Sequence, residues 1–192
     1  INRGLDWLVK HQDSDGRWDA DGFHKHDKLT DKCDGEGEME HDVGVTGLAV
    51  LTLLECGVEL DSEHADALFR GVHWLIGKQN SRSGLFGEKI GHTYIYGHGI
   101  ATAALAEAYR FSGDPELREP IQAAIKFIVE ARKEGGAWRY DSPSRGDQDT
   151  SVTTWMVKAL WAAEDSGLGF DAASKEGAKV WIDSATEKKS GR

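Results

Sequence analysis

Metal-binding side chains are concentrated between residues 19 and 42, in the segment DADGFHKHDKLTDKCDGEGEMEHD. The segment holds nine Asp and Glu residues together with His24, His26, Cys33 and His41. Zn²⁺ binds imidazole, thiolate and carboxylate groups, whereas Ca²⁺ binds oxygen ligands such as carboxylates. The acids do not match the EF-hand spacing around a fixed Gly. Zinc or calcium at this acidic loop is one prediction, and a solvated acidic loop is the alternative.

A second group of candidate residues lies at the beginning of three apolar segments. When these segments are aligned by their apolar residues, Asp42 and Asp149 share one position, and His98 lies one position later. Acids at such positions can cap helices by accepting hydrogen bonds from the first free amides. Alternatively, they line the mouth of a central cavity together with His98, Tyr94 and Tyr96. Both interpretations place these residues at helix N-termini.

The elements that must position these residues alternate between two apolar patterns. Near residues 68–76, 121–129 and 178–185, apolar residues recur every three or four positions, which indicates helices with one buried face. The other pattern is apolar nearly all round, which indicates helices covered on most sides. It occupies residues 43–54, 100–109 and 152–163. We therefore expect an all-α fold with an outer and an inner layer of helices.

Aromatic residues recur at similar spacing along the chain. Trp7 and Trp74 are 67 residues apart, Phe127 follows 53 residues later, and Trp181 follows after another 54. This spacing predicts tandem αα-hairpins of about 50 residues, with an insertion in the first. One domain of about three and a half repeats is expected, divided at 1–57, 58–113, 114–167 and 168–192. The first residue is Ile1 and not Met, and the chain ends after half a repeat. We therefore expect it to be a fragment of a longer chain.

Connections from outer to inner helices are long, at roughly 13–41, 80–97 and 134–148, whereas the return connections are short. In an array of alternating helices the long connections must all emerge at one end. The only β-like run, HTYIYG at 92–97, belongs to one of them and is predicted to be a loop. One rim of the molecule is therefore expected to carry most of the elaboration.

A short turn follows three of the outer helices and contains Gly and an aromatic residue. Its first copy, QDSDGRW, contains Gln12, Asp15, Gly16 and Trp18; the second has Gln79, Gly84 and Phe86; the third has Arg132, Gly135, Gly136 and Trp138. This pattern resembles the Q-x-x-D-G-x-W repeat of the squalene-hopene cyclase and prenyltransferase superfamily, including bacterial members of unassigned activity. The resemblance implies an α/α toroid, of which this chain supplies part. It also implies that the turns tie neighbouring outer helices together.

The same resemblance suggests an activity. Class II terpene cyclases protonate their substrate with a D-x-D-D motif, and Asp147-Gln148-Asp149-Thr150 matches only its first three letters. Asp149, Asp147 and His98 are therefore the catalytic candidates, and Trp155 is a candidate wall residue of an isoprenoid cavity. Protein prenyltransferases hold Zn²⁺ with Asp, Cys and His, which makes the acidic loop relevant to this comparison.

Bulk composition restricts the partners. The 192 residues carry a formal net charge of -10, and the longest basic run is Lys188-Lys189, which disfavours nucleic acid. No run approaches the roughly 20 apolar residues of a membrane span. We expect a binding or scaffolding module that uses its rim or concave face, and part of an isoprenoid enzyme is the alternative. An apolar small molecule, a protein, a second copy or absent repeats are the expected partners; the compartment is not fixed by the sequence.

Overall fold

The computed structural model describes residues 2–28, 30, 32–134, 136–143, 146, 148–169 and 172–186. These residues form seven α-helices and three short 3₁₀ helices, and no strand occurs among them. The α-helices are α1 (Asn2–Lys10), α2 (Asp42–Glu55), α3 (Glu63–Gly77), α4 (Tyr94–Ser112), α5 (Arg118–Ala131), α6 (Thr150–Asp165) and α7 (Ala172–Ala185). The 3₁₀ helices are η1 (Phe23–His26), η2 (Met39–His41) and η3 (Pro115–Leu117). The all-α prediction is confirmed.

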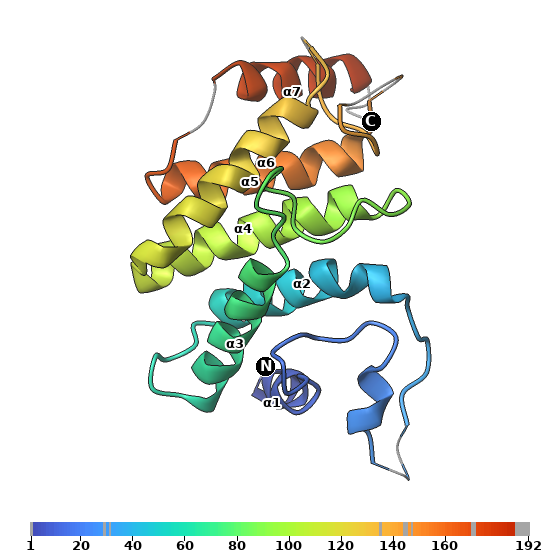
Figure 1. Cartoon of the computed structure of the whole chain (residues 1–192), viewed down its shortest axis with the longest axis vertical. Coiled ribbons are helices and arrows are strands. Elements are labelled where there is room, and N and C mark those ends of the chain that lie inside the picture. The colour runs from blue at the N-terminus through green and yellow to red at the C-terminus, as the bar shows by residue number, and fades with distance from the viewer. Residues whose placement is uncertain are drawn as a thin grey trace.

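The helices that are apolar nearly all round lie side by side, with α4 between α2 and α6 (Figure 1). Helix α3 packs on α2, α5 packs on α4 and α6, and α7 packs on α6. The N-terminal ends of α2, α4 and α6 all lie on the right in Figure 1. The long connections that precede these helices therefore meet at one end of the molecule, which we call the rim.

Helix α4 is buried along most of its length because it has a neighbour on each side. Glycines allow these neighbours to come close. A Cβ atom added to Gly47 would lie 2.9 Å from Cγ2 of Ile100, and one added to Gly99 would lie 3.1 Å from Cε of Met156. The other sides of α2 and α6 remain open, since Leu48 and Trp161 are 42% and 52% exposed. The two inner helices at the ends of the row thus lack the cover that their apolar pattern predicts.

The prediction of a loop at 92–97 is wrong, because residues from Tyr94 onward form the first turn of α4. Tyr94 and Ile95 are almost completely buried in this turn. Burial against neighbouring helices outweighs the β-propensity of Tyr and Ile, which is a weak and context-dependent preference. Helix α4 therefore begins six residues earlier than the apolar pattern indicates.

The first aromatic turn is fastened to helix α3. The side-chain amide of Gln12 donates hydrogen bonds to the carbonyl oxygens of Gly16, at 2.8 Å, and of Ala67, at 2.7 Å. Gly16 has a φ of 101°. A side chain there would also collide with the carbonyl oxygen of Arg70. The turn therefore requires glycine both for its backbone conformation and for its contact with α3.

The later turns repeat this arrangement on the next outer helices. Gln79 donates to the carbonyl oxygens of Gly84, at 3.0 Å, and of Pro120, at 2.8 Å. Pro120 lies in the first turn of α5. In the third turn Arg132 replaces glutamine, and its guanidinium donates to the carbonyl oxygen of Gly136 at 3.3 Å. Gly135 of this turn lies outside the described residues. The first two turns thus connect successive outer helices, which is the role that the family resemblance implies.

Replacing Gln12 with Ala should lower the free energy of unfolding by about 1–3 kcal/mol, because the buried side-chain hydrogen bonds to the carbonyl oxygens of Gly16 and Ala67 are lost. Urea unfolding at neutral pH measures this loss. Gln122→Ala, on the exposed side of α5, is the control and should change stability by less than about 0.5 kcal/mol. Equal effects of the two substitutions would contradict the fastening role of Gln12.

Candidate functional site

Each aromatic turn also donates one backbone hydrogen bond to an inner helix, and these bonds define which residues of the inner helices are equivalent. The bonds run from Trp18 N to Thr46 Oγ1 at 3.0 Å, from Phe86 N to His98 Nδ1 at 3.1 Å, and from Trp138 N to Thr153 Oγ1 at 3.3 Å. Counting back four residues from each acceptor reaches Asp42, Tyr94 and Asp149. Tyr94, and not His98, is therefore the counterpart of the two acids.

His98 is completely buried inside α4, so its predicted place at the rim is wrong. Its Nδ1 atom accepts the hydrogen bond from Phe86, and its Nε2 atom lies 3.3 Å from the carbonyl oxygen of Ala124. The ring of Phe127 meets the imidazole edge to face. Burial lowers the pKa of His98 to about 4, which keeps the ring neutral at physiological pH. His98 therefore connects the second turn to α4 and α5 as an uncharged group.

Asp149 caps α6, as one of the two sequence interpretations predicts. Its carboxylate accepts hydrogen bonds from Val152 N at 2.9 Å, from Ser151 Oγ at 2.7 Å and from Tyr140 Oη at 2.9 Å. Burial alone would raise the pKa of Asp149, but these three hydrogen bonds outweigh it and hold the pKa below its ordinary value. The group is therefore an ionised cap. Asp147 lies outside the residues that the structure describes.

Asp42 does not cap a helix, because it is the first residue of α2 and its side chain points to the preceding loop. One carboxylate oxygen accepts a hydrogen bond from Ala20 N at 2.8 Å, and the other accepts from Nη1 of Arg17 at 3.0 Å. Burial raises the pKa of Asp42 above its ordinary value. The carboxylate thus joins the acidic loop to the start of α2.

Arg17 lies at the centre of an ion-pair cluster that the sequence patterns did not reveal. Besides Asp42, its guanidinium contacts Asp13 at 3.1 Å and Asp19 at 3.3 Å. Lys25 binds both of these carboxylates, at 2.6 and 2.7 Å. Burial opposes ionisation of Asp13 and Asp19, but the hydrogen bonds from Lys25 and the other basic neighbours hold both pKa values below the ordinary range. Two buried acids, Asp13 and Asp19, are thereby held as carboxylates at the base of the acidic loop.

The four predicted metal ligands of this loop are not brought into one group in the described part of the chain. His26 contacts Asp13 at 2.7 Å, His24 contacts Glu36 at 3.4 Å, and Cys33 is exposed. His41 lies near Glu38 and Glu40, and a separate group contains Asp19, Asp21 and Asp42. Two members of the latter group already bind Arg17. The loop is therefore partly organised by ion pairs within the chain.

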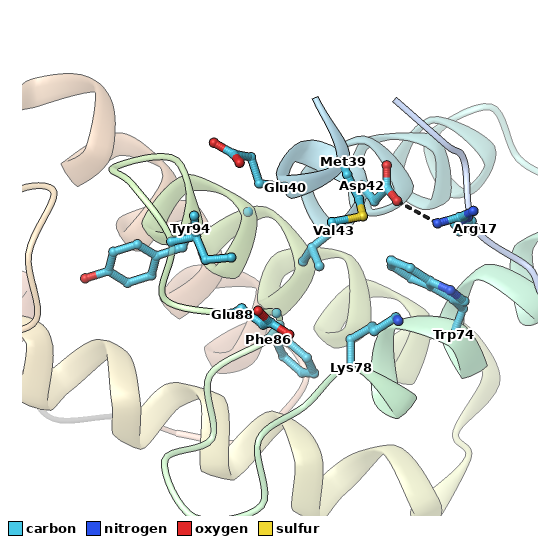
Figure 2. A pocket seen from close by; sticks show the side chains of 13 residues that line it. Arg17, Met39, Glu40, Asp42, Val43, Trp74, Lys78, Phe86, Glu88 and Tyr94 are labelled. Atoms are coloured by element: carbon cyan, nitrogen blue, oxygen red, sulfur yellow. Dashed lines mark hydrogen bonds and ion pairs between the residues drawn. The ribbon is translucent and has the colours of Figure 1, made fainter. Parts of the chain in front are cut away.

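A pocket of about 220 Å³ opens at the rim beside this cluster (Figure 2). Its walls come from the starts of α2 and α4, the end of α3 and the second aromatic turn. They include Arg17, Met39, Glu40, Asp42, Val43, Trp74, Lys78, Phe86, Glu88, Ile90 and Tyr94. We call this the rim pocket. It brings together Asp42 and Tyr94, two of the four predicted ligand-binding residues.

The other two predicted ligand-binding residues lie outside the rim pocket. Tyr96 faces a neighbouring hollow between α2 and α4, and its hydroxyl lies 2.7 Å from the hydroxyl of Ser151. Trp155 is half-buried on α6, with the ammonium group of Lys158 5.5 Å from the centre of its ring. The predicted residues are therefore distributed over three surfaces and do not converge on one cavity.

The rim pocket combines an apolar floor with a charged mouth. Phe86 and Tyr94 are buried in its walls, whereas Met39 and Ile90 are exposed at its edge. The ammonium group of Lys78 lies 5.0 Å from the centre of the Trp74 ring, and Glu40 and Glu88 lie nearby on the exposed edge. Such a site can bury an apolar group while pairing charges of either sign around it.

Comparisons with known proteins returned no match: no family model, no curated protein and no solved structure is similar to this chain. The described helices include none that is long and apolar enough to span a membrane.

Replacing Arg17 with Met should lower the free energy of unfolding by about 3 kcal/mol at neutral pH, because Asp13, Asp19 and Asp42 would lose their shared counter-ion. Chemical denaturation measures the change. Arg82→Met, on an exposed loop, is the matched control and should have almost no effect. A loss no larger than that of the control would mean that Lys25 alone satisfies the cluster.

His98 should make stability depend on pH. Its folded pKa of about 4 lies below the ordinary 6.5, so the unfolded chain binds the extra proton more readily. The contribution is complete above pH 6.5 and is lost as the pH falls towards 4, by roughly 3 kcal/mol in total. Unfolding free energies of the wild type and His98→Thr over this range test it. The difference between them should shrink on acidification, and a constant difference would contradict the assignment.

Proposed function

We propose that the chain is part of an α/α toroid of the squalene-hopene cyclase and prenyltransferase type. Two features support this. The helices are arranged in an inner row, α2, α4 and α6, with outer helices packed against it. In addition, all three aromatic turns donate a hydrogen bond to the adjacent inner helix, and the first two also donate one to the next outer helix.

We further propose that the domain is a binding module and that the rim pocket receives one apolar or aromatic side chain of a protein partner. The observation that carries this is the exposed apolar edge of the pocket, where Met39 and Ile90 lie beside charges of both signs. A volume of about 220 Å³ is below the range of about 300–1,000 Å³ typical of sites that enclose a small molecule. A side chain presented by a protein surface fits such a site better than a polyprenyl chain does.

The geometry of Asp149 supports binding over cyclisation. An acid that protonates an alkene must carry its proton before the reaction, which requires a raised pKa. The pKa of Asp149 is instead lowered by three hydrogen bonds, and the carboxylate caps α6. Conversion of a polyprenyl substrate by the chain, abolished in Asp149→Asn, would be the result that supports the enzyme alternative.

Titration of the ¹⁵N-labelled chain with N-acetyl-tryptophanamide, followed by NMR, tests the rim pocket with a defined aromatic side chain. Amide shifts should be concentrated at Val43, Gly87 and Gly97, which line the pocket or border it. Ile90→Asp should weaken binding by about tenfold, because it places a charge on the apolar edge. Leu60→Asp changes an exposed apolar residue outside the pocket and should leave binding unchanged. Shifts dispersed over other surfaces would contradict the proposal.

A further inference from the structure

The open side of α2 forms, with α1 and the acidic loop, a hollow of about 510 Å³. Its walls are mainly apolar and include Trp7, Leu8, Val45, Leu48, Ala49 and Thr52. We call this hollow the flank groove. Trp7 and Leu48 are 41% and 42% exposed there, although Leu5 of α1 and Val50 and Leu53 of α2 are buried. The flank groove is thus a helix face without a partner in this structure.

The internal repeat shows what kind of group covers this face elsewhere in the same molecule. Thr46 and His98 are equivalent through their turn hydrogen bonds, so α4 follows α2 by 52 residues. Three wall residues of the groove, Val45, Leu48 and Ala49, therefore correspond to Gly97, Ile100 and Ala101. In α4 these three positions are buried, and they contact Gly44 and Gly47 of α2. In the next repeat, the equivalent face of α4 is therefore covered by an inner helix, α2.

The wall of the groove that α1 forms also has an equivalent in the next repeat, on α3. Gln12 and Gln79 are equivalent, so α3 follows α1 by 67 residues, and Trp7 and Leu8 correspond to Trp74 and Leu75. Both later residues are buried in the hydrophobic core. Helix α2 packs against both α3 and α4. The walls of the flank groove, from α1 and α2, are therefore equivalent to the surfaces of α3 and α4 against which α2 packs.

The closest contacts of α2 define the sequence that such a position accepts. Gly47 lies against Ile100, where a Cβ atom would be only 2.9 Å away. Three residues later, Val50 packs against Gly71 of α3, where an added Cβ atom would be 2.9 Å from Cγ2 of Val50. The α1 residue equivalent to Gly71 is Gly4, and the space beside it is open. The groove therefore keeps room for the same pair of contacts.

We propose that the flank groove binds an apolar helix of a partner polypeptide, lying parallel to α2. The helix carries a glycine that faces Leu48 and Ala49, and an apolar residue three positions later that faces Gly4. The proposal rests on the repeat register and the exposed walls, and it is independent of the rim pocket.

A labelled peptide of residues 42–55, with lysines added at its ends for solubility, provides the probe, because α2 occupies the equivalent position in the next repeat. Fluorescence anisotropy with the whole chain should show saturable binding. The same peptide with Gly47→Leu should bind at least tenfold more weakly, since the added side chain meets Leu48 of the groove. This pair of peptides distinguishes a shaped position from general attraction between apolar surfaces.

Variants of the whole chain complete the test. Leu48→Lys and Gly4→Val should each weaken binding of the unmodified peptide by about tenfold, whereas Leu60→Lys should leave it unchanged. Circular dichroism and thermal melting establish that each variant is folded. Equal binding of the two peptides, or equal loss in the Leu60→Lys control, would overturn the proposal. Quenching of Trp7 by farnesol, without peptide binding, would also overturn it and identify a small apolar molecule as the occupant.

Discussion

The structure depends on the hydrogen bonds by which the aromatic turns connect the outer helices to each other and to the inner helices. All three turns donate one backbone N–H to an inner helix. In the first two turns a glutamine side chain also donates to a carbonyl oxygen of its own turn and to one of the next outer helix. Because each turn contacts both the next outer helix and the adjacent inner helix, it fixes their relative position. The two layers are therefore held in register by a few polar contacts, and apolar packing supplies most of the burial.

This constraint explains why one inner acceptor can be histidine while the others are threonine. The turn needs only a hydrogen-bond acceptor at one position along the inner helix. Nδ1 of the neutral His98 imidazole accepts this bond, as Oγ1 does at Thr46. The imidazole also reaches Ala124 of α5 and contacts Phe127, which a threonine could not do. The larger side chain thus links three elements, and its burial makes that link sensitive to acid.

Most of the fold was predictable from sequence because apolar periodicity, glycine positions and turn composition all indicated the same helices. The register between inner helices was not, since a helix that is apolar on nearly all sides offers no polar face to align. The alignment by apolar residues consequently placed His98 at the rim. The Arg17 cluster was missed for another reason: Asp42 lies 25 residues after Arg17, and only folding brings its carboxylate to the guanidinium that also contacts Asp13 and Asp19.

The two candidate binding surfaces follow from the same repeat, but they select partners by different physics. At the rim, the inner helices begin and the turns end, so polar groups surround a small apolar floor. Charges there can set the orientation of a bound partner and the rate at which it associates. Along the flank, a row of apolar side chains continues a helix layer, and selectivity comes from shape. A glycine-sized gap rejects helices with a larger residue at that position, as Gly47 and Gly99 show within the chain. A partner that uses both surfaces would therefore need a charged contact at the rim and a small-residue helix along α2.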